Sequence, residues 1–182
     1  MAIREIVLYP EAREVLTTEC EPVEEVDDEI KQLVDDLIET MYDANGVGLA
    51  APQIGVTKRI TVIDVSDPEA EEREPIVLIN PEIIEEEGEL TWEEGCLSFP
   101  GLYGDVERAA KVKVRALDRD GEPYEIEGEE LLSVALQHEI DHLDGVLFIH
   151  RMSGLKRRMA LKEYKKIRAR LAEQQDDQEA AQ

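Results

Sequence analysis

Residues 129–145 read EELLSVALQHEIDHLDG, and this stretch decides how the rest of the chain is arranged. Its pattern predicts a helix over residues 129–143, which ends at Gly145. His138 and His142 stand four residues apart within it. Both imidazoles therefore project from one face of the helix, one turn apart, as two ligands of one metal ion would. The pattern is typical of zinc proteases, but two histidines do not complete a metal site.

A catalytic metal centre needs a third protein ligand and an open coordination position. Glu139 is rotated by one residue from the first histidine, so it can reach a water beside the metal rather than the metal itself. Downstream, Asp144 is too close, His150 falls past the helix end, and Glu163 lies in a basic segment. Upstream, Cys96 stands between a glycine and a proline, where a thiolate could point at a metal. Taken alone, such a cysteine is more often a buried, apolar-like side chain, so the third ligand stays open.

The segments around this helix predict the fold class. Strand-like runs follow one another rather than alternating with helices, which is typical of α+β proteins with antiparallel sheets. We therefore expect antiparallel β-sheets packed around a central metal-binding helix, with a C-terminal helix. The expected strands are 59–65, 76–80, 82–90, 111–118 and 123–127, the other expected helices are 27–44 and 154–172, and 46–55 and 96–108 are expected to be irregular.

Length and composition limit the class of protein. A chain of 182 residues suits one domain, which we expect to span residues 1–173, followed by a disordered acidic tail over residues 174–182. No apolar run is long enough to cross a membrane, and the first residues lack the apolar core of a signal peptide. Two cysteines are too few for a disulfide framework. We expect a cytoplasmic protein with neither a membrane nor DNA as a partner.

The charge is large and uneven. The net charge is −24, and self-repulsion on that scale leads us to hypothesise a surface adapted to high salt. Residues 155–170 nevertheless contain eight basic residues and one acidic residue. This segment indicates either an anionic partner or a helix that neutralises the acidic body, and the charge pattern alone favours neither.

A glycine-rich stretch, GVGLAAPQIG at residues 46–55, has two interpretations. It is not a dinucleotide-binding loop, because a helix precedes it and the third glycine of that fingerprint is missing. Its glycines could simply serve turns. Alternatively, it is a flat backbone ribbon with which a peptide can pair, and Gln53 supplies an amide that can donate to an oxyanion.

Three segments together resemble a known family. GVGLAAPQIG (46–55), EEGCLSFP (93–100) and QHEIDH (137–142), in this order, are similar to the three signature motifs of bacterial peptide deformylases. The similarity continues from PVEEV (22–26) through KVKVRALDRDG (111–121) to the C-terminal helix. The resemblance therefore covers nearly the whole chain.

The resemblance implies a metal centre. Cys96, His138 and His142 match the metal ligands of the family, which is associated with iron(II). A thiolate with two imidazoles also suits Zn²⁺, Ni²⁺ or Co²⁺, so Fe²⁺ is expected and the other ions are possible substitutes.

The resemblance also implies the reaction. The family removes formate from the N-formyl-methionine that begins new bacterial proteins. Glu139 matches its general acid/base, while Gln53 and the backbone N–H of Leu97 match its oxyanion donors. The expected substrate is therefore an N-formyl-methionyl nascent peptide. Since the family works on chains emerging from the ribosome, the basic helix 154–172 is expected to dock there.

Side chains near the metal helix are expected to bind the substrate. Leu131, Val134 and Ala135 precede His138 on the same face and could line an apolar pocket for methionine, or could equally be core residues. Val47, Gly48 and Glu94 complete the expected substrate-binding set. Glu94 is also a candidate to support the ligands from behind, and Asp141 is a candidate to pair with Arg108 and brace the helix.

Two other functions remain as alternatives to a deformylase. A metallopeptidase would share the helix but would need a different third ligand. A non-enzymatic metal-binding or ribosome-binding module would have a closed structural site. Cys96 as a metal ligand distinguishes a deformylase from a metallopeptidase. An open coordination position together with formate release distinguishes it from a non-enzymatic module.

Overall fold

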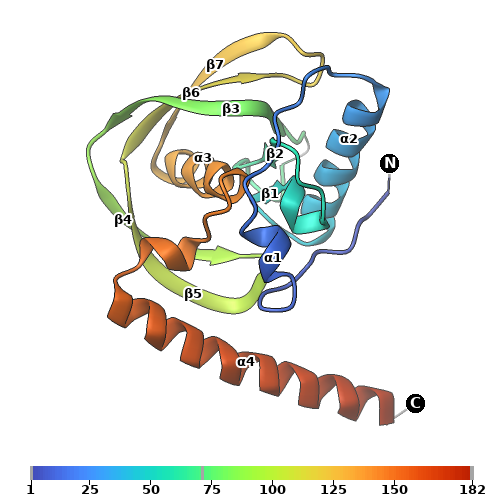
Figure 1. The fold of residues 1–182 in the computed structure, drawn as a ribbon, viewed down its shortest axis with the longest axis vertical. Coiled ribbons are helices and arrows are strands. Elements are labelled where there is room, and N and C mark those ends of the chain that lie inside the picture. The colour runs from blue at the N-terminus through green and yellow to red at the C-terminus, as the bar shows by residue number, and fades with distance from the viewer. Residues whose placement is uncertain (1, 71, 181–182) are drawn as a thin grey trace.

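The protein is an α+β fold in which two antiparallel sheets enclose one buried helix, as the sequence predicts (Figure 1). The structure is a computed structural model that describes residues 2–70 and 72–180. The strands are β1 (Gly48–Ala50), β2 (Ile60–Ile63), β3 (Ile76–Glu87), β4 (Leu90–Cys96), β5 (Phe99–Arg108), β6 (Lys111–Leu117) and β7 (Pro123–Glu129). The helices are α1 (Arg13–Leu16), α2 (Asp28–Asp43), α3 (Glu130–Leu143) and α4 (Gly154–Ala180), with short 3₁₀ turns η1 (Ala51–Ile54) and η2 (Phe148–Arg151).

The central helix α3 is buried almost all the way round. Every residue from Ser133 to Leu143 is buried, because the helix packs against β1, β2, β6 and β7 on one side and reaches β5 on the other. Figure 1 shows α3 between the five-stranded sheet, ordered β1-β2-β3-β6-β7, and the β4–β5 hairpin. A polar residue on this helix is therefore held inside the molecule, where its partners decide its chemistry.

One helix and one hairpin follow the sequence expectation closely. The helix α2 begins after its N-cap residue Asp27, whose carboxylate accepts a hydrogen bond from the backbone N–H of Ile30. Its apolar stripe packs on the sheet around β1 and β2. The β6–β7 hairpin also forms around Gly121, which has a φ of +84°, as the Asp-Gly turn predicts.

The region expected to be irregular, residues 96–108, is instead mostly strand β5. It pairs with β4 from Leu90↔Arg108 to Gly95↔Tyr103, with a register shift just before Cys96. The sequence did not predict this strand, because its glycines and its proline have a low preference for strand conformation. A partner strand that supplies the hydrogen bonds overrides that preference. At Gly95 an added Cβ would lie 2.6 Å from the ring of Tyr103 on the paired strand, so a larger residue there would have to displace that ring.

Two further boundaries differ from the sequence expectation. The two strands expected over 76–80 and 82–90 are one long strand, β3, which passes through Pro81 with a register shift at that point, because proline cannot donate to the ladder. The glycine-rich stretch 46–55 is not a plain loop, since it contains β1 at the sheet edge and then η1. Placing β1 at the edge leaves one side of this strand without a neighbour in its sheet.

The C-terminal helix is longer than expected. The sequence predicts a helix over 154–172 and a disordered tail from residue 174, whereas α4 continues to Ala180. Residues 181 and 182 of that tail lie outside the described residues. Figure 1 shows α4 running along the outer side of β5. No helix in the described part of the chain is both long and apolar enough to cross a membrane.

Candidate active site

Three potential metal ligands converge at one point. Cys96 ends β4, and His138 and His142 project from one face of α3. One donor atom from each lies within 4.8 Å of the others, and the Cys96 Sγ is 3.4 Å from the His142 Nε2. Metal–sulfur and metal–nitrogen bonds of about 2.3 and 2.1 Å in a tetrahedral site would place such atoms roughly 3.6 Å apart. The chain therefore brings together a thiolate and two imidazoles with the spacing and the chemistry that fit one divalent ion.

The two histidines are held differently. The Nδ1 of His138 lies 2.7 Å from the Glu94 Oε1, which orients the ring and leaves Nε2 for a metal. The Nδ1 of His142 is the one buried side-chain nitrogen or oxygen without a hydrogen-bond partner in the described residues. Burial, and after it the charges of His138 and Arg108, lower the pKa of His142 well below its usual value. Its imidazole is therefore neutral, the form that binds metal.

Glu139 is a buried carboxylate beside the ligands. Its side chain is held by the Thr61 hydroxyl, whose Oγ1 lies 3.3 Å from the Glu139 Oε2. An added Cβ on Gly48 would lie 2.5 Å from the Glu139 Oε1, so the carboxylate rests directly on the backbone of β1. Burial raises the pKa of Glu139 to about 7. A carboxylate with that pKa can both accept and return a proton near neutral pH.

The two predicted oxyanion donors lie next to Cys96. Gln53 is buried in η1, and its Oε1 accepts a hydrogen bond from the backbone N–H of Ala50. Its Nε2 donates to the Ser98 hydroxyl at 3.2 Å and lies 3.5 Å from the Cys96 Sγ. The second, longer contact leaves one N–H directed at the space around the metal ligands. Leu97 directly follows Cys96, which places its backbone N–H at the same point of the chain.

A cavity of about 400 Å³ opens onto these groups. It brings together the predicted metal, catalytic and substrate-binding residues except His142, which lies outside its lining. It also contains Trp92 from β4, and sequence reasoning missed this residue because an isolated aromatic in a strand carries no motif. The predicted residues that line it are Val47, Gly48, Gln53, Glu94, Cys96, Leu97, Leu131, Val134, Ala135, His138 and Glu139.

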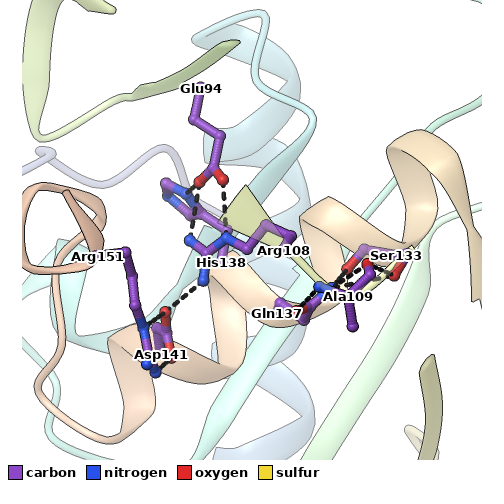
Figure 2. Close-up of polar contacts among 8 residues, drawn as sticks. All are labelled: Glu94, Arg108, Ala109, Ser133, Gln137, His138, Asp141 and Arg151. Atoms are coloured by element: carbon purple, nitrogen blue, oxygen red, sulfur yellow. Dashed lines mark hydrogen bonds and ion pairs between the residues drawn. The ribbon is translucent and has the colours of Figure 1, made fainter. Parts of the chain in front are cut away.

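Glu94 lines the cavity, but both of its carboxylate oxygens already contact Arg108 or His138 (Figure 2). Arg108 donates to it through Nε (2.8 Å) and Nη2 (2.9 Å), and the His138 ring occupies the same carboxylate. Although burial raises the pKa of Glu94, the hydrogen bonds from Arg108 and His138 outweigh burial and hold it below its usual value. The carboxylate therefore supports a metal ligand and has little freedom to bind a substrate.

Arg108 and Asp141 form the brace that the sequence suggested. The Arg108 Nη1 lies 2.6 Å from the Asp141 Oδ2, with both residues buried. Figure 2 shows that Asp141 also faces Arg151, a residue that sequence reasoning did not single out. On the next turn of α3, Gln137 exchanges hydrogen bonds with the backbone of Ala109, directly after Arg108. The back of α3 is thus tied to the end of β5 at two consecutive places.

This arrangement defines a class of protein. Two imidazoles on a buried helix, a third soft ligand from a neighbouring strand, and a carboxylate of raised pKa are the parts of a metal-dependent hydrolase.

The comparisons with known proteins identify the family within that class. Residues 3–158 match the family described as Polypeptide deformylase. A peptide deformylase from Acidobacterium capsulatum is 58% identical over 92% of this chain and 96% of its own length. One from Alkalilimnicola ehrlichii is 53% identical over 92% of each chain. The crystal structure of a peptide deformylase from Legionella pneumophila superposes with a TM-score of 0.85 at 51% identity, covering 94% of this chain and 98% of that one.

The chain belongs to the polypeptide deformylase family and is an enzyme. The similarity to the Legionella structure also confirms the predicted fold class.

Proposed function

We propose that this chain removes the formyl group from the N-terminal formyl-methionine of newly synthesised proteins and releases formate. One observation carries the proposal: Cys96, His138 and His142 converge beside the buried Glu139, at the end of a cavity that reaches the surface. Three protein ligands leave a coordination position open, which a hydrolytic site needs and a structural site lacks. A bound divalent ion would supply a Lewis acid that polarises the formyl carbonyl and makes water acidic near neutral pH.

The residues of the chain would do the rest. Glu139 takes the proton of the attacking water and returns it to the amine that leaves, a task that its pKa of about 7 suits. The N–H of Gln53 that faces Cys96 and the backbone N–H of Leu97 donate to the oxyanion that forms at the formyl carbon. One such donor contributes about 3–4 kcal/mol to the transition state.

We propose that the cavity holds the methionine side chain. Leu131, Val134 and Ala135 line it from the turns of α3 that precede His138, and Trp92 faces it from β4. A flexible thioether suits an apolar pocket of this kind. Val47 and Gly48 lie at the other side, along the edge strand β1, where an extended peptide backbone could pair.

Iron(II) is the ion that we propose for the centre, with Zn²⁺, Ni²⁺ and Co²⁺ as substitutes. The support is the donor set itself, because one thiolate and two imidazoles suit each of these ions. The test is formate release from formyl-Met-Ala-Ser by protein purified without oxygen, with metal analysis on the same sample. Turnover that follows iron content supports the proposal, and metal-loaded protein that releases no formate would refute it.

We also propose that α4 docks on the ribosome, which places the enzyme in the cytoplasm beside its substrate. Among the eight basic residues of 155–170, the described salt bridges engage only Lys166 and Arg168. The remaining cations are thus free for an anionic surface such as ribosomal RNA. Deleting α4 would be a poor test, because Tyr164 is buried against Phe99 and its removal would expose the core.

Point variants give the cleaner experiment. Replacing Arg158 and Lys162 with glutamine removes two exposed charges from α4. As a control, replacing Lys111 and Arg115 with glutamine removes two charges from β6 that pair with glutamates of β7. Ribosome binding should weaken only in the α4 variant, and the slope of log affinity against log salt should fall by about 2. Turnover of a short formyl-peptide should stay unchanged in both. Equal ribosome binding by the two variants would exclude docking through α4.

A further inference from the structure

The ring of His138 is held by a chain of charged side chains that ends outside the site (Figure 2). The Glu94 Oε1 lies 2.7 Å from the His138 Nδ1 and also accepts from the Arg108 Nη2. Arg108 in turn contacts Asp141, and Asp141 contacts Arg151. The signs alternate along this chain, so each member is placed by the next.

Arg151 closes the chain with a two-pronged contact. Its Nε lies 3.0 Å from the Asp141 Oδ2 and its Nη2 lies 2.7 Å from the Oδ1. Such a fork fixes both the position and the plane of a carboxylate, which a single hydrogen bond cannot do. Arg151 lies on η2, outside the three motifs that carry the other site residues.

The charge balance behind the metal ligands depends on Arg151. Glu94 and Asp141 are both buried, and Arg108 alone would have to serve two carboxylates. With Arg151 present, two guanidinium groups face two carboxylates. Without it, Asp141 would compete with Glu94 for Arg108. Any shift of Arg108 towards Asp141 would loosen the Glu94 oxygen that orients His138, because that oxygen serves both partners.

We propose that Arg151 is a positioning residue for the metal centre: through Asp141, Arg108 and Glu94 it holds the imidazole of His138 in the orientation that binds metal. The contrast with His142, whose Nδ1 has no partner in the described residues, explains why His138 is the ligand that such a chain can control. This inference rests on the proposed metal set, since it assigns Arg151 a role in orienting one of its ligands.

A purely structural role is the competing explanation. Arg151 ends η2, whose Phe148 packs near the His138 ring at a centroid distance of 6.0 Å and edge-on against Phe99 at 5.4 Å. Losing Arg151 could therefore loosen η2 and lower stability without touching the metal. The test must include readouts that respond to the metal ligands and not merely to stability.

The experiment compares Arg151→Met with Arg115→Met. Both variants replace an arginine whose side chain is about half exposed with a methionine. Arg115, however, lies on β6 and pairs with Glu125. Each protein is loaded with Co²⁺. Its visible spectrum, the rate at which a chelator removes the ion, kcat, KM and the melting temperature are then measured. Arg151→Lys is the conservative variant, because it keeps the charge but not the fork.

If Arg151 positions His138, Arg151→Met changes the Co²⁺ absorption bands and releases the ion about tenfold faster, the lower end of the range for groups that orient ligands. The kcat falls while KM stays near the value of the parent. Arg151→Lys lies between the parent and Arg151→Met in spectrum and release rate, and it carries the test alone if the methionine variant does not fold. A lower melting temperature with the spectrum and release rate of Arg115→Met would overturn the proposal.

Failure of the underlying function gives a different result. If the metal set itself is wrong, the parent and Arg115→Met also fail to bind Co²⁺ with a thiolate charge-transfer band. If only the role of Arg151 is wrong, all the proteins bind the ion alike.

Discussion

The two sides of α3 carry polar groups in opposite states. Beside the cavity of about 400 Å³, Cys96 of β4 meets His138, His142 and Glu139 of α3. These groups have few partners, and the Nδ1 of His142 has none in the described residues. The opposite side, beneath a second and polar cavity of about 480 Å³, holds Arg108, Gln137 and Asp141 in a network where each side chain is paired. Reactive groups thus remain available on one side because saturated groups fix the helix from the other.

The largest difference between the two sides of α3 should appear in catalysis, when Glu139 on the cavity side is replaced. Glu139→Ala should lower turnover of a formyl-peptide by about 10²–10⁴-fold, the usual contribution of a general acid/base. The metal content should remain that of the parent, because the carboxylate is not among the proposed ligands. Formate release per bound metal is the measurement. Loss of metal together with turnover would show that Glu139 belongs to the ligand set instead.

On the opposite side the corresponding loss is in stability. Arg108→Met removes the only guanidinium that contacts both Glu94 and Asp141 in the described structure. Breaking a buried ion pair at one partner typically costs about 3–5 kcal/mol. Urea unfolding of the metal-free variant should show a loss of that size. The control Arg119→Met breaks a half-exposed pair with Asp35 and should cost under about 1 kcal/mol.

The pH dependence of stability should have opposite signs on the two sides in metal-free protein. Burial raises the pKa of Glu139 from 4.5 to about 7, so the folded state binds the extra proton and this contribution is lost as pH rises through that interval. The pKa of Glu94 is lowered against the opposing effect of burial, so its contribution is present above about pH 4.5 and is lost as pH falls.

Unfolding free energies at pH 3, pH 5 and pH 7.5 test this difference. Glu139→Gln should gain about 2 kcal/mol relative to the parent between pH 5 and pH 7.5, because the pKa of Glu139 is about 7 in the folded protein. Glu94→Gln should lose stability relative to the parent at pH 5 and pH 7.5, and the loss should shrink at pH 3. Parallel pH curves for the two variants would contradict the assigned signs.

The smallest expected effect comes from adding one carbon. Gly48→Ala places a Cβ 2.5 Å from the Glu139 Oε1 and must displace the carboxylate. Since small misplacements of a catalytic group are costly, turnover should fall about tenfold or more while the metal content stays the same. Gly154→Ala is the matched control, because a Cβ there has no neighbour within 4 Å. Equal activity of the two alanine variants would show that the position of Glu139 is not set by β1.

The same contrast explains what the sequence could predict. The helices α2 and α3 follow local periodicity, and two of the three proposed ligands are visible because they lie one turn apart on a helix. Cys96 lies 42 residues before His138, and only the resemblance to a family assigned it as the third ligand. No spacing pattern in a sequence reveals that a strand and a distant helix meet in the fold. Thr61 and Arg151 were missed for the same reason: each acts on α3 from a separate element.

The β4–β5 hairpin was missed for a related reason. Glycine and proline at residues 100, 101 and 104 argue against a strand when the segment is considered alone. Pairing with β4 and burial of Phe99, Leu102 and Val106 stabilise it nevertheless. Contacts between segments that are distant in sequence decided both the strand and the third ligand, and a single sequence shows neither directly.

The contact between α4 and the segment around Tyr9 has a consequence for how the fold is completed. The Tyr164 hydroxyl and the Arg168 guanidinium both donate to the carbonyl of Tyr9. The rings of Tyr9 and Phe99 stack, and the ring of Tyr164 lies tilted against both. The residues joined by the bond between Tyr164 and Tyr9 are 155 positions apart in the sequence. Contacts of such long separation form late in folding, because closing a long loop costs entropy before the contact stabilises the chain. Since Cys96 packs against this cluster, the surroundings of the proposed third ligand are completed only when α4 packs against the N-terminal segment.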